Sequence, residues 1–137
     1  MSLLPRKGLL AIAAVVDVAL NARERPVSSR KLAARHNLPP RHLEPVLQAL
    51  VHEGVLNGVR GPRGGYQLAR ERKRISVADI LRAAGTVEEA EKDTPRSRIL
   101  DDVVLPVIAD AERAFTTALA RLSLEDMTKR AEQQRDR

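Results

Sequence analysis

Residues 60–70 read RGPRGGYQLAR, and this stretch is the strongest indication of the fold. It holds three of the chain's seven glycines and its only tyrosine. Glycine accepts positive φ and proline fixes φ near a turn value, so residues 61–65 predict a tight, exposed chain reversal. The flanking runs VLNGV (55–59) and YQLAR (66–70) are β-prone, with Tyr66 and Leu68 on one face. The stretch therefore predicts a β-hairpin whose tip carries Arg60 and Arg63.

The segment 25–54, directly before the hairpin, predicts two short helices joined by a tight turn. Ser28 or Ser29 is a good N-cap for the first helix, and residues 37–40 (NLPP) end it because proline bars the preceding residue from helical φ/ψ. The second helix starts near Pro40 or Arg41 and stops at Gly54. The apolar residues of its inner face are Leu43, Val46, Leu47 and Leu50. Two such helices form a helix-turn-helix, and the hairpin behind them is a wing.

In a winged helix-turn-helix the exposed first turn of the second helix enters the major groove of DNA. Here that turn carries Arg41, His42 and Glu44. The glycines keep the hairpin tip thin enough for the narrow minor groove, where an arginine meets a concentrated negative potential. Pro45 leaves two alternatives open: either the second helix starts later than Pro40, or Pro45 kinks it.

The distribution of charge favours a polyanionic partner. Residues 1–74 hold 14 Lys and Arg against 5 Asp and Glu, whereas residues 75–137 hold 10 against 13. A basic surface of this kind attracts nucleic acid without choosing a sequence. The chain has neither a bilayer-length apolar stretch nor a signal-peptide cleavage pattern, so a soluble cytoplasmic protein is expected. Its three histidines show no catalytic or metal-ligand spacing, so neither an enzyme nor a metal site is expected.

The rest of the chain predicts further helices around this unit. Residues 8–21 read as a helix that is apolar on almost every side, and Ser76 with Asp79 forms a capping box for a helix that ends at Gly85. Helical spacing returns over residues 97–122, with Pro106 as a kink or a fresh helix start. The apolar stripe of this last helix, assigned to dimerisation, is Val104, Ile108, Ala111, Phe115, Ala118 and Leu122.

Two alternatives exist for that apolar stripe: it folds back on its own domain, or it pairs antiparallel with the same helix of a second subunit, which we favour. The expected fold class is mainly α, a winged helix-turn-helix with a two-stranded hairpin and a long C-terminal dimerisation helix. Residues 1–85 form the DNA-binding domain, 86–96 an acidic loop, and 97–137 the dimerisation helix and tail. A last short helix is capped by Ser123 and Asp126, and the polar end 131–137 is expected to fray.

Several segments resemble the bacterial winged-helix regulators that include the iron-sulfur regulator IscR, the nitric-oxide sensor NsrR and the cysteine regulator CymR. The resemblance covers about residues 5–128, and its segments are VDVALN, LAARHNLPPRHLEPVLQALVHEGVL, RGPRGGYQLAR, ISVADILRAAG and LSLED. It implies a homodimeric transcription factor, usually a repressor, that binds a palindromic operator in double-stranded DNA.

The resemblance also implies roles for particular residues. Glu44 reads a base, Arg41 and His42 lie beside it, and Arg60 enters the minor groove. Phosphates are held by Ser28, Ser29, Arg30 and the backbone of the wing. The implied DNA-binding set is therefore Ser28, Ser29, Arg30, Arg41, His42, Glu44, Arg60, Arg63 and Gly64. A surface pair between Glu44 and Arg41 is the alternative role for that carboxylate.

One departure from the family limits what carries over. Cluster-binding relatives carry three cysteines before the long helix, and this chain has none, so no cofactor of that kind is expected. In the loop before the long helix, we expect the carboxylates to be solvated rather than to bind a cation. They are Glu88, Glu89, Glu91 and Asp93. Three kinds of signal remain for such a regulator: a small metabolite, a partner protein, or nothing beyond the concentration of the regulator itself. The rival to DNA binding is a winged helix that docks a metabolic enzyme.

Overall fold

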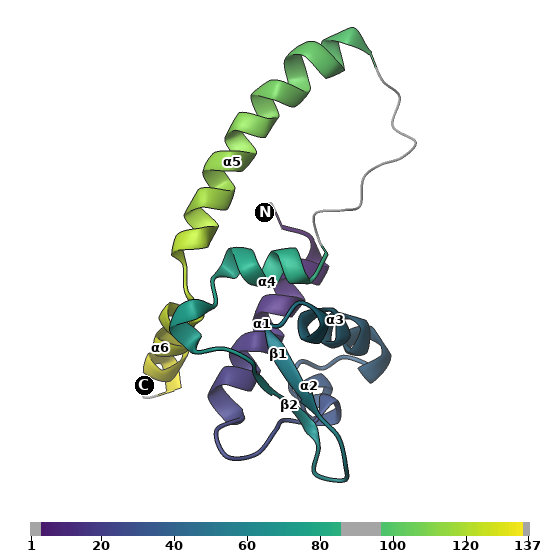
Figure 1. Ribbon diagram of the computed structural model, residues 1–137, viewed down its shortest axis with the longest axis vertical. Helices are drawn as coiled ribbons and strands as arrows, with labels where there is room; N and C mark the ends of the chain where they lie inside the picture. Colours follow the sequence, from purple (N-terminus) through teal and green to yellow (C-terminus); the bar gives the residue numbers. More distant parts are fainter. Residues whose placement is uncertain (1–3, 86–96, 136–137) are drawn as a thin grey trace.

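The computed structural model describes residues 4–85 and 97–135. The expected acidic loop at 86–96 lies outside these described residues. The elements are α1 (Arg6–Asn21), α2 (Ser29–Arg35), α3 (Pro40–His52), β1 (Leu56–Val59), β2 (Gly65–Leu68), η1 (Arg72–Arg74), α4 (Val77–Ala83), η2 (Leu100–Val104), α5 (Leu105–Arg121) and α6 (Leu124–Arg135). Figure 1 shows α1–α4 and the hairpin as one body, from which α5 projects before α6 returns to it.

The body is built around α1, which contributes small and branched apolar residues to a single core. Val15 and Val18 of α1, Leu32 of α2, Leu47 of α3 and Ile80 of α4 are all fully buried. Burying each such side chain contributes about 1.5–3 kcal/mol relative to leaving it exposed. Helices α2, α3 and α4 therefore pack into one core around α1.

Helix α3 begins at Pro40, in agreement with the sequence interpretation, and its backbone continues as α-helix through Pro45. A proline at the first helical position costs nothing, because the N–H that it lacks would have no partner there. The alternative that the helix starts later is therefore wrong. Pro45 is exposed, so its ring faces away from the core.

The hairpin has the predicted position, with β1 and β2 antiparallel and Gly58 opposite Tyr66. It is joined to the start of the helix-turn-helix by Val27, whose N–H and carbonyl both bond to the backbone of Tyr66, at 2.9 and 2.8 Å. This contact requires glycine at position 65, where φ is +154° and a Cβ would lie 2.3 Å from the carbonyl oxygen of Val27. The turn itself is closed by the Gly64 N–H, which donates to the Gly61 carbonyl at 2.9 Å.

The C-terminal helical segment accommodates Pro106 through a change in hydrogen-bond pattern. A π-helical turn, η2, stands directly before α5, and the Leu105 N–H bonds to the Leu100 carbonyl five residues back. Proline cannot donate a bond and crowds the carbonyl four residues before it, and a wider turn relieves both problems. Pro106 thus lies in the first turn of α5, with helical backbone on both sides.

Helix α6 packs back against the body. Ser123 and Asp126 form the predicted reciprocal capping bonds, both at 3.1 Å, and Leu124 is fully buried in the same core as α1. The expected fraying is wrong for residues 131–135, because α6 continues to Arg135. Residues 136–137 lie outside the described part of the chain. Its C-terminal half is held by Glu132, which pairs with Arg23 of the α1–α2 loop at 3.1 Å.

Candidate nucleic-acid interface

The first turn of α3 presents its polar residues to solvent. Arg41, His42 and Glu44 are exposed, whereas Leu43 and Leu47 on the opposite side are fully buried. The helical period alone separates these faces, because residues 43 and 47 lie one turn apart. Glu44 makes no ion pair with Arg41 in the part of the chain that the structure describes, so the alternative of a surface pair is not found.

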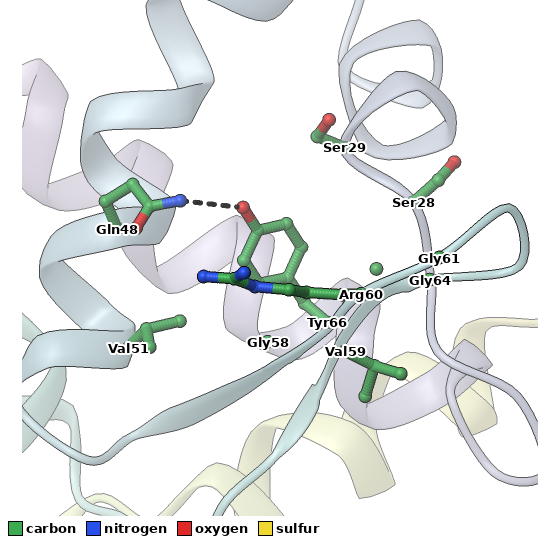
Figure 2. A pocket seen from close by; sticks show the side chains of 11 residues that line it. Ser28, Ser29, Gln48, Val51, Gly58, Val59, Arg60, Gly61, Gly64 and Tyr66 are labelled. Atoms are coloured by element: carbon green, nitrogen blue, oxygen red, sulfur yellow. Dashed lines mark hydrogen bonds between the residues drawn. The ribbon is translucent and has the colours of Figure 1, made fainter.

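An open cleft of about 480 Å³ separates the hairpin from α3 and the start of α2 (Figure 2). It brings together four of the nine predicted DNA-binding residues, namely Ser28, Ser29, Arg60 and Gly64. Figure 2 shows the Arg60 side chain lying across this cleft. The wing and the first helix of the helix-turn-helix therefore share one surface with the outer side of α3.

The other predicted residues lie around the cleft rather than in its lining. Arg30 is exposed in the first turn of α2, and Arg63 is exposed at the tip of the hairpin, beside Pro62. Arg41, His42 and Glu44 occupy the beginning of α3. Arg30, Arg41, Arg60 and Arg63 make no ion pair within residues 4–85 and 97–135. Their charges are therefore not neutralised by described carboxylates.

The cleft also contains residues that the sequence interpretation missed. Gln48 of α3 and Tyr66 of β2 both line it, and the Gln48 Nε2 atom donates a hydrogen bond to the Tyr66 Oη atom at 3.3 Å (Figure 2). Gln48 lies four residues after Glu44, which puts it on the same exposed helix face. That spacing is the signal that could have found it.

The walls of the cleft are fixed relative to each other by short contacts. Ser28 caps α2, because its Oγ atom accepts a bond from the Lys31 N–H at 3.2 Å. The residue before it, Val27, forms the backbone bridge to Tyr66. The cap of α2, the hairpin and, through Tyr66, helix α3 are thus connected within a few bonds.

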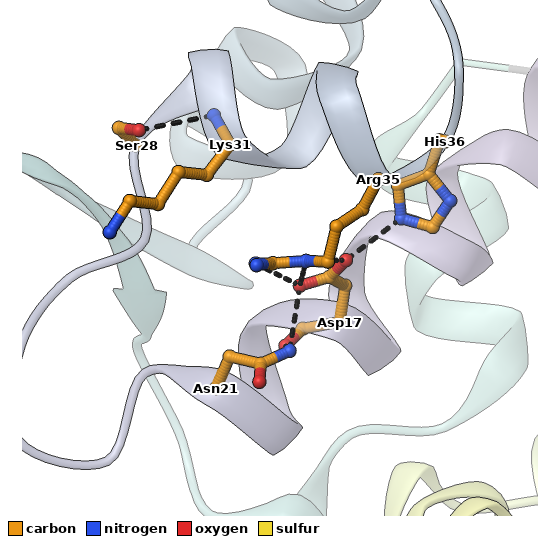
Figure 3. A network of polar contacts seen from close by, with 6 residues as sticks. All are labelled: Asp17, Asn21, Ser28, Lys31, Arg35 and His36. Carbon is orange, nitrogen blue, oxygen red and sulfur yellow. Dashed lines mark hydrogen bonds and ion pairs between the residues drawn. The ribbon is translucent and has the colours of Figure 1, made fainter.

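A buried carboxylate connects the helix-turn-helix to α1. Asp17 accepts from the Arg35 guanidinium at 2.7 and 2.9 Å, from the Asn21 amide at 3.0 Å, and lies 3.0 Å from the His36 Nε2 atom (Figure 3). Burial by itself raises the pKa of Asp17, but the hydrogen bonds from Arg35 and Asn21 and the nearby charges outweigh it, so the pKa lies below its ordinary value. Arg35 and His36 end α2, so this contact orients α2 just before the turn into α3.

Most of the apolar face of helix α5 is exposed, and Leu119 near its C-terminal end is the residue of this helix that packs against the core of the body. None of the α5 residues is buried, and Ile108 is 48% exposed. The stripe residues that flank α5, Val104 in η2 and Leu122 after the helix, are 41% and 44% exposed. The alternative that this helix folds back along its own domain is therefore wrong, because α5 leaves the body along most of its length (Figure 1). Among the described residues no helix is long and apolar enough to cross a membrane.

Comparison with known proteins identifies the family. A family model described as Rrf2, iron-dependent transcriptional regulator, matches residues 4–130. The chain is 35% identical over 129 residues to the HTH-type regulator candidate slr0846 of Synechocystis sp., covering 90% of this chain and 86% of that protein. The structure resembles that of T. potens IscR, with a TM-score of 0.74, 32% identity, and coverage of 94% and 88% of the two chains.

A second solved relative is CymR (YrzC), the global cysteine regulator of B. subtilis, with a TM-score of 0.71, 25% identity, and coverage of 94% and 98%. The family description names iron, but this chain has no cysteine with which to ligate an iron–sulfur cluster. Nor do its described residues include a group of His, Asp and Glu that could hold a metal ion. The chain, a DNA-binding winged helix-turn-helix protein and not an enzyme, belongs to the Rrf2 family of transcriptional regulators.

Proposed function

We propose that this regulator acts as a homodimer that binds a palindromic operator in double-stranded DNA and represses transcription without an iron–sulfur cluster. The observation that carries the proposal is the shared surface on which the wing, the start of α2 and the outer side of α3 meet around one cleft. Four arginines there, Arg30, Arg41, Arg60 and Arg63, make no ion pair with a described carboxylate, and they supply the positive potential that phosphates require.

Each groove receives a different element in this proposal. The exposed turn of α3 enters the major groove, where the Glu44 carboxylate accepts from the N4 amino group of a cytosine and Arg41 and His42 contact neighbouring groups. Arg60 enters the adjacent minor groove with the tip of the hairpin. Ser28, Ser29, Arg30, Arg63 and the backbone at Gly64 hold phosphates, which fixes the position of the protein without reading sequence.

The uncovered face of α5 supports the dimer. Its predicted contact residues recur at alternating spacings of four and three, which is the pattern of a seam between two packed helices. They are Val104, Ile108, Ala111, Phe115, Ala118 and Leu122. An antiparallel pairing with the same helix of a second subunit covers this face in both copies at once, because a two-fold interface uses one patch twice.

The proposal is tested by a mobility-shift titration on an inverted repeat whose half-sites lie about one helical turn apart. We expect a complex of one dimer per repeat, whose affinity falls steeply as salt rises. A scrambled duplex of equal length and composition is the control. Equal affinity for both duplexes would contradict specific regulation.

Two variants test the assigned contacts on the same duplexes. Glu44→Ala should lower the discrimination at one base pair by about 1–3 kcal/mol, whereas Arg60→Ala should weaken binding to all duplexes and flatten the salt dependence. Two variants that bind like the parent would show that the site residues are assigned wrongly. Transcription from an operator-controlled promoter, with and without the regulator, decides between repression and activation.

A further inference from the structure

The cleft between α3 and the hairpin lies between the two elements that enter neighbouring grooves of DNA in the proposed complex. In B-form DNA a major groove and the adjacent minor groove are divided by one sugar–phosphate strand. A protein with a helix in one groove and a hairpin tip in the other must therefore pass that strand between the two elements. In this chain the space between α3 and the hairpin is the cleft of about 480 Å³.

We propose that this cleft seats the dividing strand and that Tyr66, Gln48 and Ser29 donate hydrogen bonds to one of its phosphates. The inference rests on the proposed function, since it takes for granted that α3 and the hairpin occupy neighbouring grooves. It adds Tyr66, Gln48 and Gly58 to the residues that contact DNA.

The chemistry of the lining suits a phosphate. The polar side chains around the cleft are the hydroxyls of Ser28, Ser29 and Tyr66, the amide of Gln48 and the guanidinium of Arg60. Every one of them can donate a hydrogen bond, and no carboxylate is among the lining residues. Phosphodiester oxygens only accept, so donors without a competing anion are the set that a strand of DNA requires.

The contact between Gln48 and Tyr66 leaves a hydrogen-bond donor of each side chain unused among the described residues. Because the Tyr66 hydroxyl accepts from the Gln48 Nε2 atom at 3.3 Å, its own hydrogen is not used in that bond. The second N–H of the Gln48 amide is also without a partner among the described residues. The backbone of Tyr66 is held by both bonds to Val27, so the tyrosine is positioned before DNA arrives and loses little freedom on binding.

Gly58 provides the room for the strand. It lies directly opposite Tyr66 in the antiparallel register, so a side chain there would point to the same face of the hairpin as the tyrosine ring. A Cβ at position 58 would meet no atom within 4 Å, and this glycine has no positive φ. The folded protein therefore tolerates a side chain at this position, and the space that it would fill is the cleft.

The first test fills the cleft without disturbing the fold. Gly58→Val should leave the far-ultraviolet circular dichroism spectrum and the midpoint of thermal unfolding unchanged within about 2 °C, and weaken operator binding by at least about tenfold. Asn57→Val is the matched control, because residue 57 is exposed on the opposite face of the same strand. A folded Gly58→Val protein that binds like the Asn57→Val control overturns the proposal.

The second test locates the phosphate with operators in which a single phosphate is replaced by an uncharged methylphosphonate. We expect one position per half-site, between the base pairs contacted by α3 and the minor groove contacted by the hairpin, to cost the parent about tenfold. Tyr66→Phe and Gln48→Ala should bind the natural operator more weakly than the parent does. Replacing the phosphate at that position should lower their affinity little further. Glu44→Ala, which changes a residue outside the cleft, should keep the full penalty.

These outcomes separate the two proposals. A parent protein that binds no duplex specifically overturns the proposed function and the strand-seating cleft together. A parent that binds its operator, while Tyr66→Phe and Gln48→Ala keep the full penalty at every methylphosphonate position, overturns only the cleft.

Discussion

Replacing Asp17 with asparagine tests whether a charged contact holds the helix-turn-helix against α1. The parent carboxylate is 7% exposed and accepts three hydrogen bonds from Arg35, at 2.7, 2.9 and 3.1 Å. Asparagine keeps the size of the side chain and removes the charge and one acceptor. The variant therefore isolates the ion pair from the packing around it.

The size of the effect follows from the unequal burial of the two partners. Removing one partner of a fully buried ion pair costs about 3–5 kcal/mol, mainly because a charge is left without solvent. The Arg35 side chain is 41% exposed, so water solvates its guanidinium in the variant. We therefore expect Asp17→Asn to lower the free energy of unfolding at pH 7 by about 2–3 kcal/mol, near the value of hydrogen bonds to a charged group.

The dependence on pH gives the same test a second readout. Because the pKa of Asp17 in the folded protein lies below its ordinary value of 3.8, the carboxylate contributes stability that is complete above that value. This contribution is lost as the pH falls through the folded pKa. The difference in unfolding free energy between parent and variant should therefore shrink as the pH falls below 3.8.

The assay is urea denaturation followed by circular dichroism at equal protein concentrations, because the proposed dimer would make the apparent stability depend on concentration. Glu24→Gln, at an exposed loop residue without an ion pair among the described residues, is the control and should change the free energy by less than about 0.5 kcal/mol. The reasoning would be refuted if Asp17→Asn lowered the free energy of unfolding at pH 7 by no more than Glu24→Gln does. It would also be refuted if the loss for Asp17→Asn persisted unchanged at about pH 2.5.

Three further changes test other parts of the fold. Gly65→Ala should cost at least about 2 kcal/mol in thermal unfolding, because its Cβ would lie 2.3 Å from the Val27 carbonyl oxygen, whereas Gly58→Ala, in open space, should cost about 0.5 kcal/mol or less. Ile108→Glu should halve the mass measured by light scattering without unfolding the subunit, and an unchanged dimer would remove α5 from its assigned role. Arg72→Ala should destabilise α6 selectively and speed hydrogen exchange in residues 124–135, since Arg72 bonds to the main chain of α1 and to α6. Exchange in residues 124–135 that is no faster than in the parent would contradict this.

The local elements of this protein could be predicted because their signals lie within a few residues. Pro40 at a helix start, the capping box of Ser76 and Asp79, and the glycines around the hairpin each act through bonds to near neighbours. The alternation of buried Leu43 and Leu47 with exposed Glu44 follows from the helical period alone. For the same reason the sequence indicated the winged helix-turn-helix and the exposed turn of α3.

The cleft and its contacts depended on how the elements pack. Gln48 and Tyr66 are separated by 18 residues, and their contact exists because the backbone bridge at Val27 places the hairpin beside α3. Asp17 meets Arg35 across the same separation, between two helices whose relative orientation no period of hydrophobic residues encodes.

The course of the C-terminal segment divides in the same way. Periodicity in the sequence predicted helical structure with one apolar face over residues 97–122, of which α5 covers Leu105–Arg121, because that pattern depends only on the angle between successive residues. The tertiary structure decided that this helix leaves the body and that α6 returns to it. The return is made by contacts between distant residues, namely the burial of Leu124 in the core around α1 and the exposed ion pair of Arg23 with Glu132, 109 residues apart, which arise only after the chain has closed on itself.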